Sequence, residues 1–556
     1  GMGIIHTTKI ITTKAIVNGK FFSFIVFVFI YVFIRRENSD FHESFAISQP
    51  QSMGFSNLYV PDYRNYNSKR TKATAYAANF CTFVNETQIK RLKINMAPRS
   101  NFGSKLGAIL VAAGSAVGLG NIWRFPTEAG NNGGGAFLII YIICVLVICI
   151  PLLLAEFMVG RHSHANTGSA YAIMSPKKHW GFIGKIEVFT SFLILSYYSV
   201  VAGWTLFYTF QSLLNRFNVM AQQHNSEEIF SVNFTNFVSN PWQPLLCMAI
   251  FMLVTHFVIV RGVKGGIEKS AKMLMPVLFV LLIILMVCSL STTGAAKGLQ
   301  FLFAPDFSKI NSEVVMAAMA QAFYSLSLGM GCMCTYASYF SKETNITKTA
   351  LTVSVIDTLV AVMAGIVIFP AVFSIAGLNP DAGPSLVFIA LPNVFQLALG
   401  GMPVMAYICS LAFYSLLVVA TLTSTISLHE VITAYLSETR KITRRKAAWF
   451  VTGGCLVFGA LCSLSMGVLA DFKIAGMGLF DVFDYVTAKI LLLIAGFFTS
   501  VFMGWIVEKK VMEYELTNDG KLKLRCFGLL IFALRYIVPA GIALVFLDGL
   551  GILNLF

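Results

Sequence analysis

Charged residues are scarce in this chain. Asp, Glu, Lys and Arg together make up 12% of its 556 residues, while hydrophobic residues make up 56%. Soluble globular domains carry about 25% charged residues, so the composition excludes an ordinary soluble domain and indicates a membrane protein. Catalytic patterns are missing as well, because no HExxH or GxSxG motif lies within an apolar run. We therefore do not expect an enzyme.

The candidate outer loops contain no cysteine, although the chain has 11 cysteines. Most of them lie within apolar runs, as Cys144, Cys288 and Cys455 do. We interpret them as small buried residues and expect no disulfide framework. His162 and His164 form a lone His-x-His pattern, which we do not interpret as a metal site.

Apolar runs long enough to cross a bilayer, roughly 20 residues each, recur along most of the chain. Nine are uninterrupted: 136–159, 186–213, 243–261, 273–291, 350–374, 403–428, 447–467, 486–507 and 527–547. Two more, 103–128 and 313–340, are interrupted by glycine and polar residues. We therefore expect an all-α polytopic membrane protein with eleven spans.

The net charge of +15 is explained by membrane orientation rather than by nucleic acid. No basic patch on a soluble domain is visible, so we expect no nucleic-acid partner. If residues 96–105 are cytoplasmic, the inner segments hold about twenty Lys and Arg and the outer segments about five, as the positive-inside rule requires. After eleven spans the C-terminus is expected outside.

Residues 1–95 precede this region and receive no function. Their apolar run at 21–34, flanked by Lys20 and Arg35, is too short for a confident span. Three readings stay open: a signal-like segment, an additional helix, or sequence upstream of a natural start at Met96.

The two interrupted runs share an unusual pattern. "GSAVGLGNIWRFP" at 114–126 and "SLSLGMG" at 325–331 place glycines and polar residues in mid-span. Each opens a block of five spans, 96–292 and 313–507, and an odd number of spans gives the second block the opposite orientation. Such an inverted repeat with two broken helices indicates a transporter whose binding site lies at the breaks. Close helix packing through Gly114 and Gly118 is the structural alternative.

Further motifs accompany these two: "NNGGGAF" (131–137), "RGVKGGIEKSAKMLMP" (261–276), "TYASY" (335–339), "GPSLVFIALP" (383–392) and "ATLTSTISLHE" (420–430). From Arg99 onward the chain resembles the neurotransmitter:sodium symporter family, in its prokaryotic LeuT-like amino-acid transporter branch. The resemblance implies a LeuT fold: a 5+5 inverted repeat with broken helices 1 and 6, plus an eleventh helix at 527–547. It also implies a multi-pass protein of the plasma (inner) membrane, embedded in the lipid bilayer of a prokaryote.

The resemblance implies two Na⁺ sites. The first takes Ala116, Asn121, Ser325 and Asp357. The second takes Gly114, Val117, Ala420, Thr423 and Ser424. Oxygen ligands of this kind suit a small dehydrated cation. As a hypothesis, Asp357 supplies the negative charge that animal members take from chloride, so chloride is not required.

The implied substrate is an amino acid that brings its own carboxylate, because amine transporters of the family carry Asp at the position of Gly118. The implied substrate-binding residues are Ala116, Leu119, Gly120, Ile194, Tyr198, Tyr324, Ser325, Ser327, Met330, Ser424 and Leu428. Their largely apolar character favours a neutral, hydrophobic amino acid. The expected function is sodium-coupled import by alternating access; an amino-acid sensor or ligand-gated channel without coupled transport is the alternative.

Gates are implied on both sides of the site. Arg124 pairs with Asp484 on the outer side, with Asp481 as the alternative partner. Arg99 pairs with Glu438 near Tyr339 on the inner side. For the buried Glu156 two readings stay open: it holds the amides freed by the second break, or it is a satisfied buried acid without a wider role.

Overall fold

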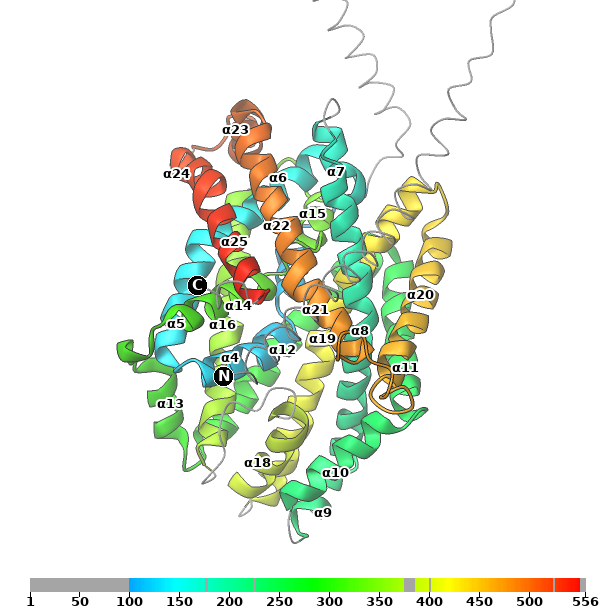
Figure 1. Ribbon diagram of the computed structural model, residues 1–556, viewed down its shortest axis with the longest axis vertical. Coiled ribbons are helices and arrows are strands. Elements are labelled where there is room, and N and C mark those ends of the chain that lie inside the picture. Colours follow the sequence, from blue (N-terminus) through cyan, green and yellow to red (C-terminus); the bar gives the residue numbers. More distant parts are fainter. Residues whose placement is uncertain are drawn as a thin grey trace, which may run out of the picture. The chain divides into compact units, whose positions relative to one another are not determined.

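The structure is a computed structural model that describes residues 100–175, 179–223, 226–374, 386–399, 402–523 and 526–550. The segment 1–95 and Arg99 lie outside these ranges. Within them the regular elements are helices, and the only β-type pairing is an isolated bridge between Ile474 and Met477. Helices α7, α15 and α23 lie at one end of the described unit, and α9, α10 and α18 lie at the other (Figure 1).

The uninterrupted spans predicted from the sequence are present. In the described ranges, nine helices are long and apolar enough to cross a membrane: Gly135–Ser163 (α5, η2 and α6), Phe182–Leu213 (α8), Gln243–Val260 (α11), Val263–Leu290 (η3 and α12), Ile346–Val372 (α16), Pro403–Thr439 (α19), Arg444–Leu464 (α20), Leu479–Ile506 (α21, η6, α22 and η7) and Phe527–Gly549 (α24, η8 and α25).

Both interrupted spans are broken, as the sequence predicts. Helix α3 (Lys105–Ala116) is bent by 50° against the following segment Gly120–Asn131, which comprises η1 and α4. Helix α14 (Ser312–Ser325) and helix α15 (Cys332–Ala337) are separated by residues 326–331. Short helices fill the connections: α7 (Thr167–Met174), α9 (Arg216–Ala221), α10 (Ser226–Ser239), α13 (Ala295–Phe303), η5 (Leu386–Ala390), α18 (Leu391–Ala398) and α23 (Lys509–Thr517).

Some spans extend beyond their apolar runs. The helix expected at 273–291 begins at Val263, and the helix expected at 403–428 continues to Thr439. Polar residues continue the first of these helices because they have partners there. Glu268 forms an ion pair with Lys272 at 2.7 Å, and its carboxylate accepts hydrogen bonds from Gly103 N (2.6 Å) and Ser104 Oγ (3.0 Å). Hydropathy alone does not detect such ends.

Helix α8 is the centre of the packing, with contacts to α7, α11, α19 and α20. Helices in lipid associate through close van der Waals packing, which small residues permit. A Cβ on Gly203 of α8 would lie 2.7 Å from the Met248 backbone nitrogen of α11, so only glycine allows this approach. Trp204, the next residue, packs edge-on against Phe388 of η5 with ring centroids 5.7 Å apart.

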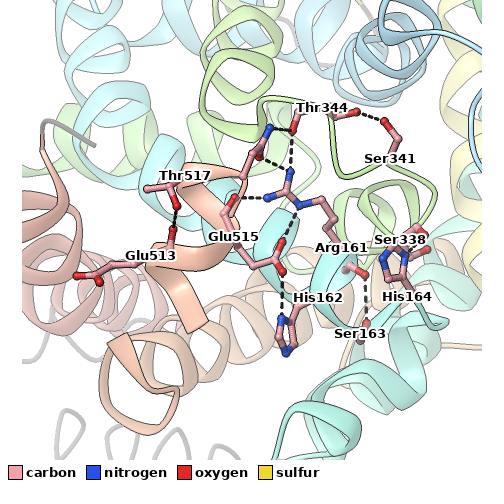
Figure 2. A network of polar contacts seen from close by, with 12 residues as sticks. Arg161, His162, Ser163, His164, Ser338, Ser341, Thr344, Glu513, Glu515 and Thr517 are labelled. Atoms are coloured by element: carbon pink, nitrogen blue, oxygen red, sulfur yellow. Dashed lines mark hydrogen bonds and ion pairs between the residues drawn. The ribbon is translucent and has the colours of Figure 1, made fainter. Parts of the chain in front are cut away.

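A buried arginine fixes α23 to the end of α6. Figure 2 shows Arg161 extending between α23 and the segment that carries Thr344. Its Nε lies 2.6 Å from Glu515 Oε2, and its Nη1 donates to the Thr344 carbonyl (2.6 Å) and to Asn518 Oδ1 (2.9 Å). His162 Nδ1 lies 3.0 Å from Glu515 Oε1. We call these five residues the α23 clamp.

Candidate functional site

The first break releases the backbone around Gly118. Helix α3 ends at Ala116, and Val117 adopts an extended conformation with φ −73° and ψ 110°. The freed Gly118 amide donates to Asn121 Oδ1 at 3.0 Å. A Cβ on Gly118 would lie 2.5 Å from Ser424 Oγ, so glycine lets the chain pass close to α19 here.

The second break contains three residues with positive φ, namely Ser327 (54°), Gly329 (74°) and Gly331 (72°). Glycine adopts this region readily, whereas a serine there is strained by about 1–3 kcal/mol. Ser327 is held there by its hydroxyl, which donates to the Ser115 carbonyl at 2.8 Å and so joins the two breaks. Gly329 N donates to Glu156 Oε1 at 2.7 Å. Of the two readings of Glu156, the contact favours the one in which it holds a freed amide.

A cavity lies between the two breaks, α8 and α19. Every residue expected to bind substrate lines it: Ala116, Leu119, Gly120, Ile194, Tyr198, Tyr324, Ser325, Ser327, Met330, Ser424 and Leu428. Ser115, Gly118 and Cys332 line it too, although the expected set omits them. Leu119 N donates to Tyr198 OH at 3.4 Å, which places an amide and a phenol hydroxyl side by side at the cavity wall.

Three of the four residues expected at the first Na⁺ site, Asn121, Ser325 and Asp357, form one buried polar cluster, and the fourth, Ala116, is the last residue of α3. Asn121 Nδ2 lies 2.7 Å from Asp357 Oδ1 and 3.0 Å from Ser325 Oγ. Ser325 Oγ lies 3.0 Å from both Asp357 carboxylate oxygens, and Tyr141 OH donates to Asp357 Oδ2 at 3.2 Å. Asp357 is completely buried. Asn121 directs its amide nitrogen into the cluster, while its Oδ1 accepts the Gly118 amide at 3.0 Å. The carboxylate and hydroxyl oxygens of Asp357 and Ser325 are ligands that suit a hard cation.

The residues expected at the second Na⁺ site also come together, between the end of α3 and the middle of α19. Thr423 Oγ1 lies 2.9 Å from the Ala420 carbonyl and 3.4 Å from the Val117 carbonyl. Ser424 Oγ lies 3.3 Å from the same Ala420 carbonyl. A Cβ on Gly114 would lie 3.6 Å from Thr423 Cβ, so Gly114 faces this group. The donors are again carbonyl and hydroxyl oxygens.

Comparison with known proteins identifies the family of this chain. The model of the sodium:neurotransmitter symporter family matches residues 99–236 and 224–551. The chain belongs to this family. It is 37% identical over 456 residues to the "Uncharacterized sodium-dependent transporter YhdH" of Bacillus subtilis, covering 82% of this chain and 98% of the relative. The chain is 31% identical over 466 residues to an "Uncharacterized sodium-dependent transporter" of Haemophilus influenzae, covering 82% of this chain and 99% of the relative.

The fold of the chain is also similar to that of a solved structure. The crystal structure of MhsT in complex with L-phenylalanine matches with a TM-score of 0.73 and 41% sequence identity, covering 81% of this chain and 100% of that chain. As a sodium:neurotransmitter symporter, the chain is a multi-pass membrane protein of the LeuT fold that performs sodium-coupled transport.

At the outer gate, the expected ion pair between Arg124 and Asp484 is not formed, and among the described residues Asp481 does not replace it. Arg124 Nε instead lies 3.7 Å from Glu128 Oε1, one helical turn away, and its guanidinium lies 4.6 Å from the centre of the Tyr324 ring. Arg124 is the last residue of the π-helical turn Gly120–Arg124. Sequence spacing did not indicate that turn.

At the inner gate, the expected pair of Arg99 and Glu438 stays a prediction, because Arg99 lies outside the described residues. Glu438 Oε2 accepts from Asn166 N (3.0 Å) and Asn166 Nδ2 (2.9 Å). Tyr339 OH donates to Glu430 Oε1 at 2.6 Å. Glu430 is fully buried and is paired with Arg444 at the start of α20, whose Nη1 lies 2.9 Å from Glu430 Oε1.

Sequence reasoning missed the pair of Glu430 and Arg444. Glu430 closes the quoted motif at 420–430, and Arg444 belongs to a cluster of basic residues after α19. Their contact depends on α19 continuing to Thr439 and turning back at once into α20. The signal in the sequence that could have indicated this pair was an acidic residue within an apolar span followed by a basic residue at the start of the next span.

Proposed function

We propose that this symporter imports a neutral, hydrophobic amino acid, driven by Na⁺ bound at two sites. The observation that carries the proposal is the cavity between the two breaks. In the described part of the chain, none of its lining side chains is charged, and apolar groups such as Ile194, Met330 and Leu428 form much of the wall. Its similarity to MhsT, whose structure contains L-phenylalanine, supports the same class of substrate.

The substrate carboxylate would lie against the amides near Leu119 and Gly120 and the hydroxyl of Tyr198. Amide donors at the start of a helical segment favour an anion. Gly118 lines the cavity, and a Cβ at this position would lie 2.5 Å from Ser424 Oγ and 3.4 Å from Tyr198 OH. A side chain here would therefore occupy the space beside Tyr198 in which we place the carboxylate. The apolar side chain of the amino acid would contact Ile194, Tyr324 and Met330, and Met330 is flexible enough to accept several shapes.

The first Na⁺ site would use the Ala116 carbonyl with Asn121, Ser325 and Asp357. The second would use the carbonyls of Gly114, Val117 and Ala420 with the hydroxyls of Thr423 and Ser424. When bound, Na⁺ supplies positive charge beside the substrate carboxylate and links the broken helix to α16 and α19. We further propose that the charge of Asp357 makes chloride unnecessary.

Alternating access would open the cavity on one side at a time. On the outer side Arg124 covers Tyr324, and Tyr324 lines the cavity. On the inner side Phe102 N donates to the Tyr339 carbonyl at 3.1 Å, and the Phe102 ring packs edge-on against Tyr339 at 5.8 Å. We place this end, with residues 96–105, in the cytoplasm, and we place the protein in the plasma membrane.

Uptake into proteoliposomes tests the proposal. Purified protein is reconstituted, and radiolabelled L-phenylalanine is offered with an inward Na⁺ gradient or with K⁺ in place of Na⁺. We expect accumulation only with Na⁺, and accelerated exchange when unlabelled L-phenylalanine is trapped inside. A protein that binds L-phenylalanine without exchange would be a sensor and would refute the transport proposal.

A further inference from the structure

Two buried carboxyl groups lie beside the second break, and neither belongs to the residues assigned to Na⁺ or to substrate. Glu156 on α6 and Glu187 on α8 are both completely buried. Glu156 Oε1 accepts the amide of Gly329 at 2.7 Å, and a Cβ on Gly331 would lie 3.2 Å from the Glu187 Cβ. Both acids therefore adjoin the non-helical segment 326–331.

Hydroxyl groups surround Glu187 on its other side. Tyr171 OH donates to Glu187 Oε1 at 2.7 Å, and Thr499 Oγ1 lies 3.3 Å from the same oxygen. The two hydroxyls lie 2.8 Å from each other. Helices α7 and α22 thus fix the position of this acid, and Glu187 and Glu156 border the same segment 326–331.

Among the described residues, no basic side chain faces this pair. The other ionisable groups around it are Tyr171 of α7 and Cys332 and Cys334 of α15, while α22 contributes only the hydroxyl of Thr499. Glu156 Oε2 and Glu187 Oε2 are buried, and within the described ranges neither has a hydrogen-bond partner. Each carboxyl group therefore has one oxygen without a partner.

Two neighbouring carboxylates cannot both remain charged in a buried site without a counter-ion. A hard metal cation needs several oxygen ligands, but only two oxygen atoms are unpartnered here. One proton would neutralise one of the two carboxyl groups and convert its unpartnered oxygen into a hydrogen-bond donor. We propose that Glu156 and Glu187 together form a binding site for a proton, and that this proton controls how firmly Glu156 holds segment 326–331.

The site is coupled to the cavity through this segment. Ser327 and Met330 line the cavity, and Ser191 of α8, close to Glu187, donates its hydroxyl to the Met330 carbonyl. An ionised Glu156 binds the Gly329 amide more strongly than a neutral one does, because a charge-assisted hydrogen bond is roughly twice as strong. Binding or release of the proton therefore changes the wall of the cavity. In so far as the proton accompanies amino-acid transport, the inference rests on the proposed function.

Infrared difference spectroscopy tests the proton site without any transport. Spectra of the purified full-length protein are recorded between neutral and alkaline pH, in the region where protonated carboxyl groups absorb. We expect a protonated-carboxyl band in the wild type, a weaker band in Glu187→Gln, where the buried Asp357 still contributes, and the wild-type intensity in Glu187→Asp. Glu313→Gln, which alters an exposed acid of α14, is the matched control. Retention of the full band in Glu187→Gln would overturn the proposal.

A second measurement tests the coupling. Proteoliposomes with a trapped pH-sensitive dye receive Na⁺ and L-phenylalanine, and we expect a change of internal pH in the wild type and in Glu313→Gln. Glu187→Gln should keep Na⁺-driven uptake and lose the dye signal. An unaltered signal in this variant would disprove the coupling. A wild type that takes up no L-phenylalanine would refute the proposed function instead, and the infrared result would still decide whether the proton site exists.

Discussion

Two adjacent tyrosines on α8 provide a comparison at the scale of single residues. Tyr198 lines the cavity and lies 3.4 Å from the Leu119 amide, whereas Tyr197 packs against Phe480 away from the cavity. A hydrogen bond to a charged group contributes about 1.5–3 kcal/mol. We therefore expect Tyr198→Phe to weaken L-phenylalanine binding by about 10- to 100-fold, as measured by equilibrium binding of the radiolabelled amino acid.

Tyr197→Phe removes the same atom from the neighbouring residue and serves as the control for Tyr198→Phe. Its affinity for L-phenylalanine should stay within about twofold of the wild type, because Tyr197 does not line the cavity. Equal losses in the two variants would show that the hydroxyl of Tyr198 stabilises the helix rather than the substrate.

Single residues also show where sequence reasoning stops. Tyr198 and Tyr324 were expected at the cavity because they occupy positions that match the family motifs. Cys332 was not expected, although it lines the same cavity. Its position follows from the path of residues 326–331, where Ser327, Gly329 and Gly331 adopt positive φ. No pattern in the sequence gives the direction of a chain that leaves helical geometry three times in five residues.

At the scale of helical elements, the α23 clamp makes a prediction about stability. The side chains of Arg161 and Glu515 are 3% and 8% exposed. Removing one partner of a buried ion pair typically costs about 3–5 kcal/mol, because the other charge stays buried. We expect Glu515→Gln to lower the apparent unfolding temperature and the hydrogen-exchange protection of Lys509–Thr517. The control Glu513→Gln changes an exposed side chain of the same helix, and a similar loss there would contradict the assignment.

The clamp should also depend on pH. Burial raises the pKa of Glu515, but the hydrogen bond from His162 and the charge of Arg161 outweigh burial and bring this pKa below its usual value of 4.5. A carboxylate whose pKa is lowered on folding stabilises the folded state above its unfolded pKa, and this stabilisation is lost as the pH falls through the folded pKa. The difference in unfolding temperature between the wild type and Glu515→Gln should therefore be constant from pH 6 to 8 and shrink below about pH 4. A difference that grows on acidification would contradict this role of Glu515.

The helical elements were predictable to the extent that they depend on local chemistry. Glycine and polar residues in mid-span predicted both breaks, because such residues in lipid need partners from outside the helix. The clamp itself was not predictable, since Arg161 and Glu515 are separated by 354 positions in the sequence. The expected pair of Arg124 and Asp484 was wrong, because the Arg124 side chain instead contacts Glu128 and the ring of Tyr324.

At the scale of the whole molecule, the question is which ions drive the transport cycle. Asp357 places a completely buried carboxyl group in the cluster expected to bind the first Na⁺, 2.7 Å from the side chain of Asn121, and the charge proposed for this group replaces that of chloride. We therefore expect Na⁺-driven uptake of L-phenylalanine to stay within about twofold when gluconate replaces chloride. Loss of wild-type uptake without chloride would disprove this role.

Asp357→Asn removes the charge and should raise the Na⁺ concentration for half-maximal uptake at least tenfold, or about 1.4 kcal/mol, with partial recovery when chloride is added. The variant Glu313→Gln loses one negative charge from an exposed side chain at the start of α14, and its Na⁺ and chloride dependence should match the wild type.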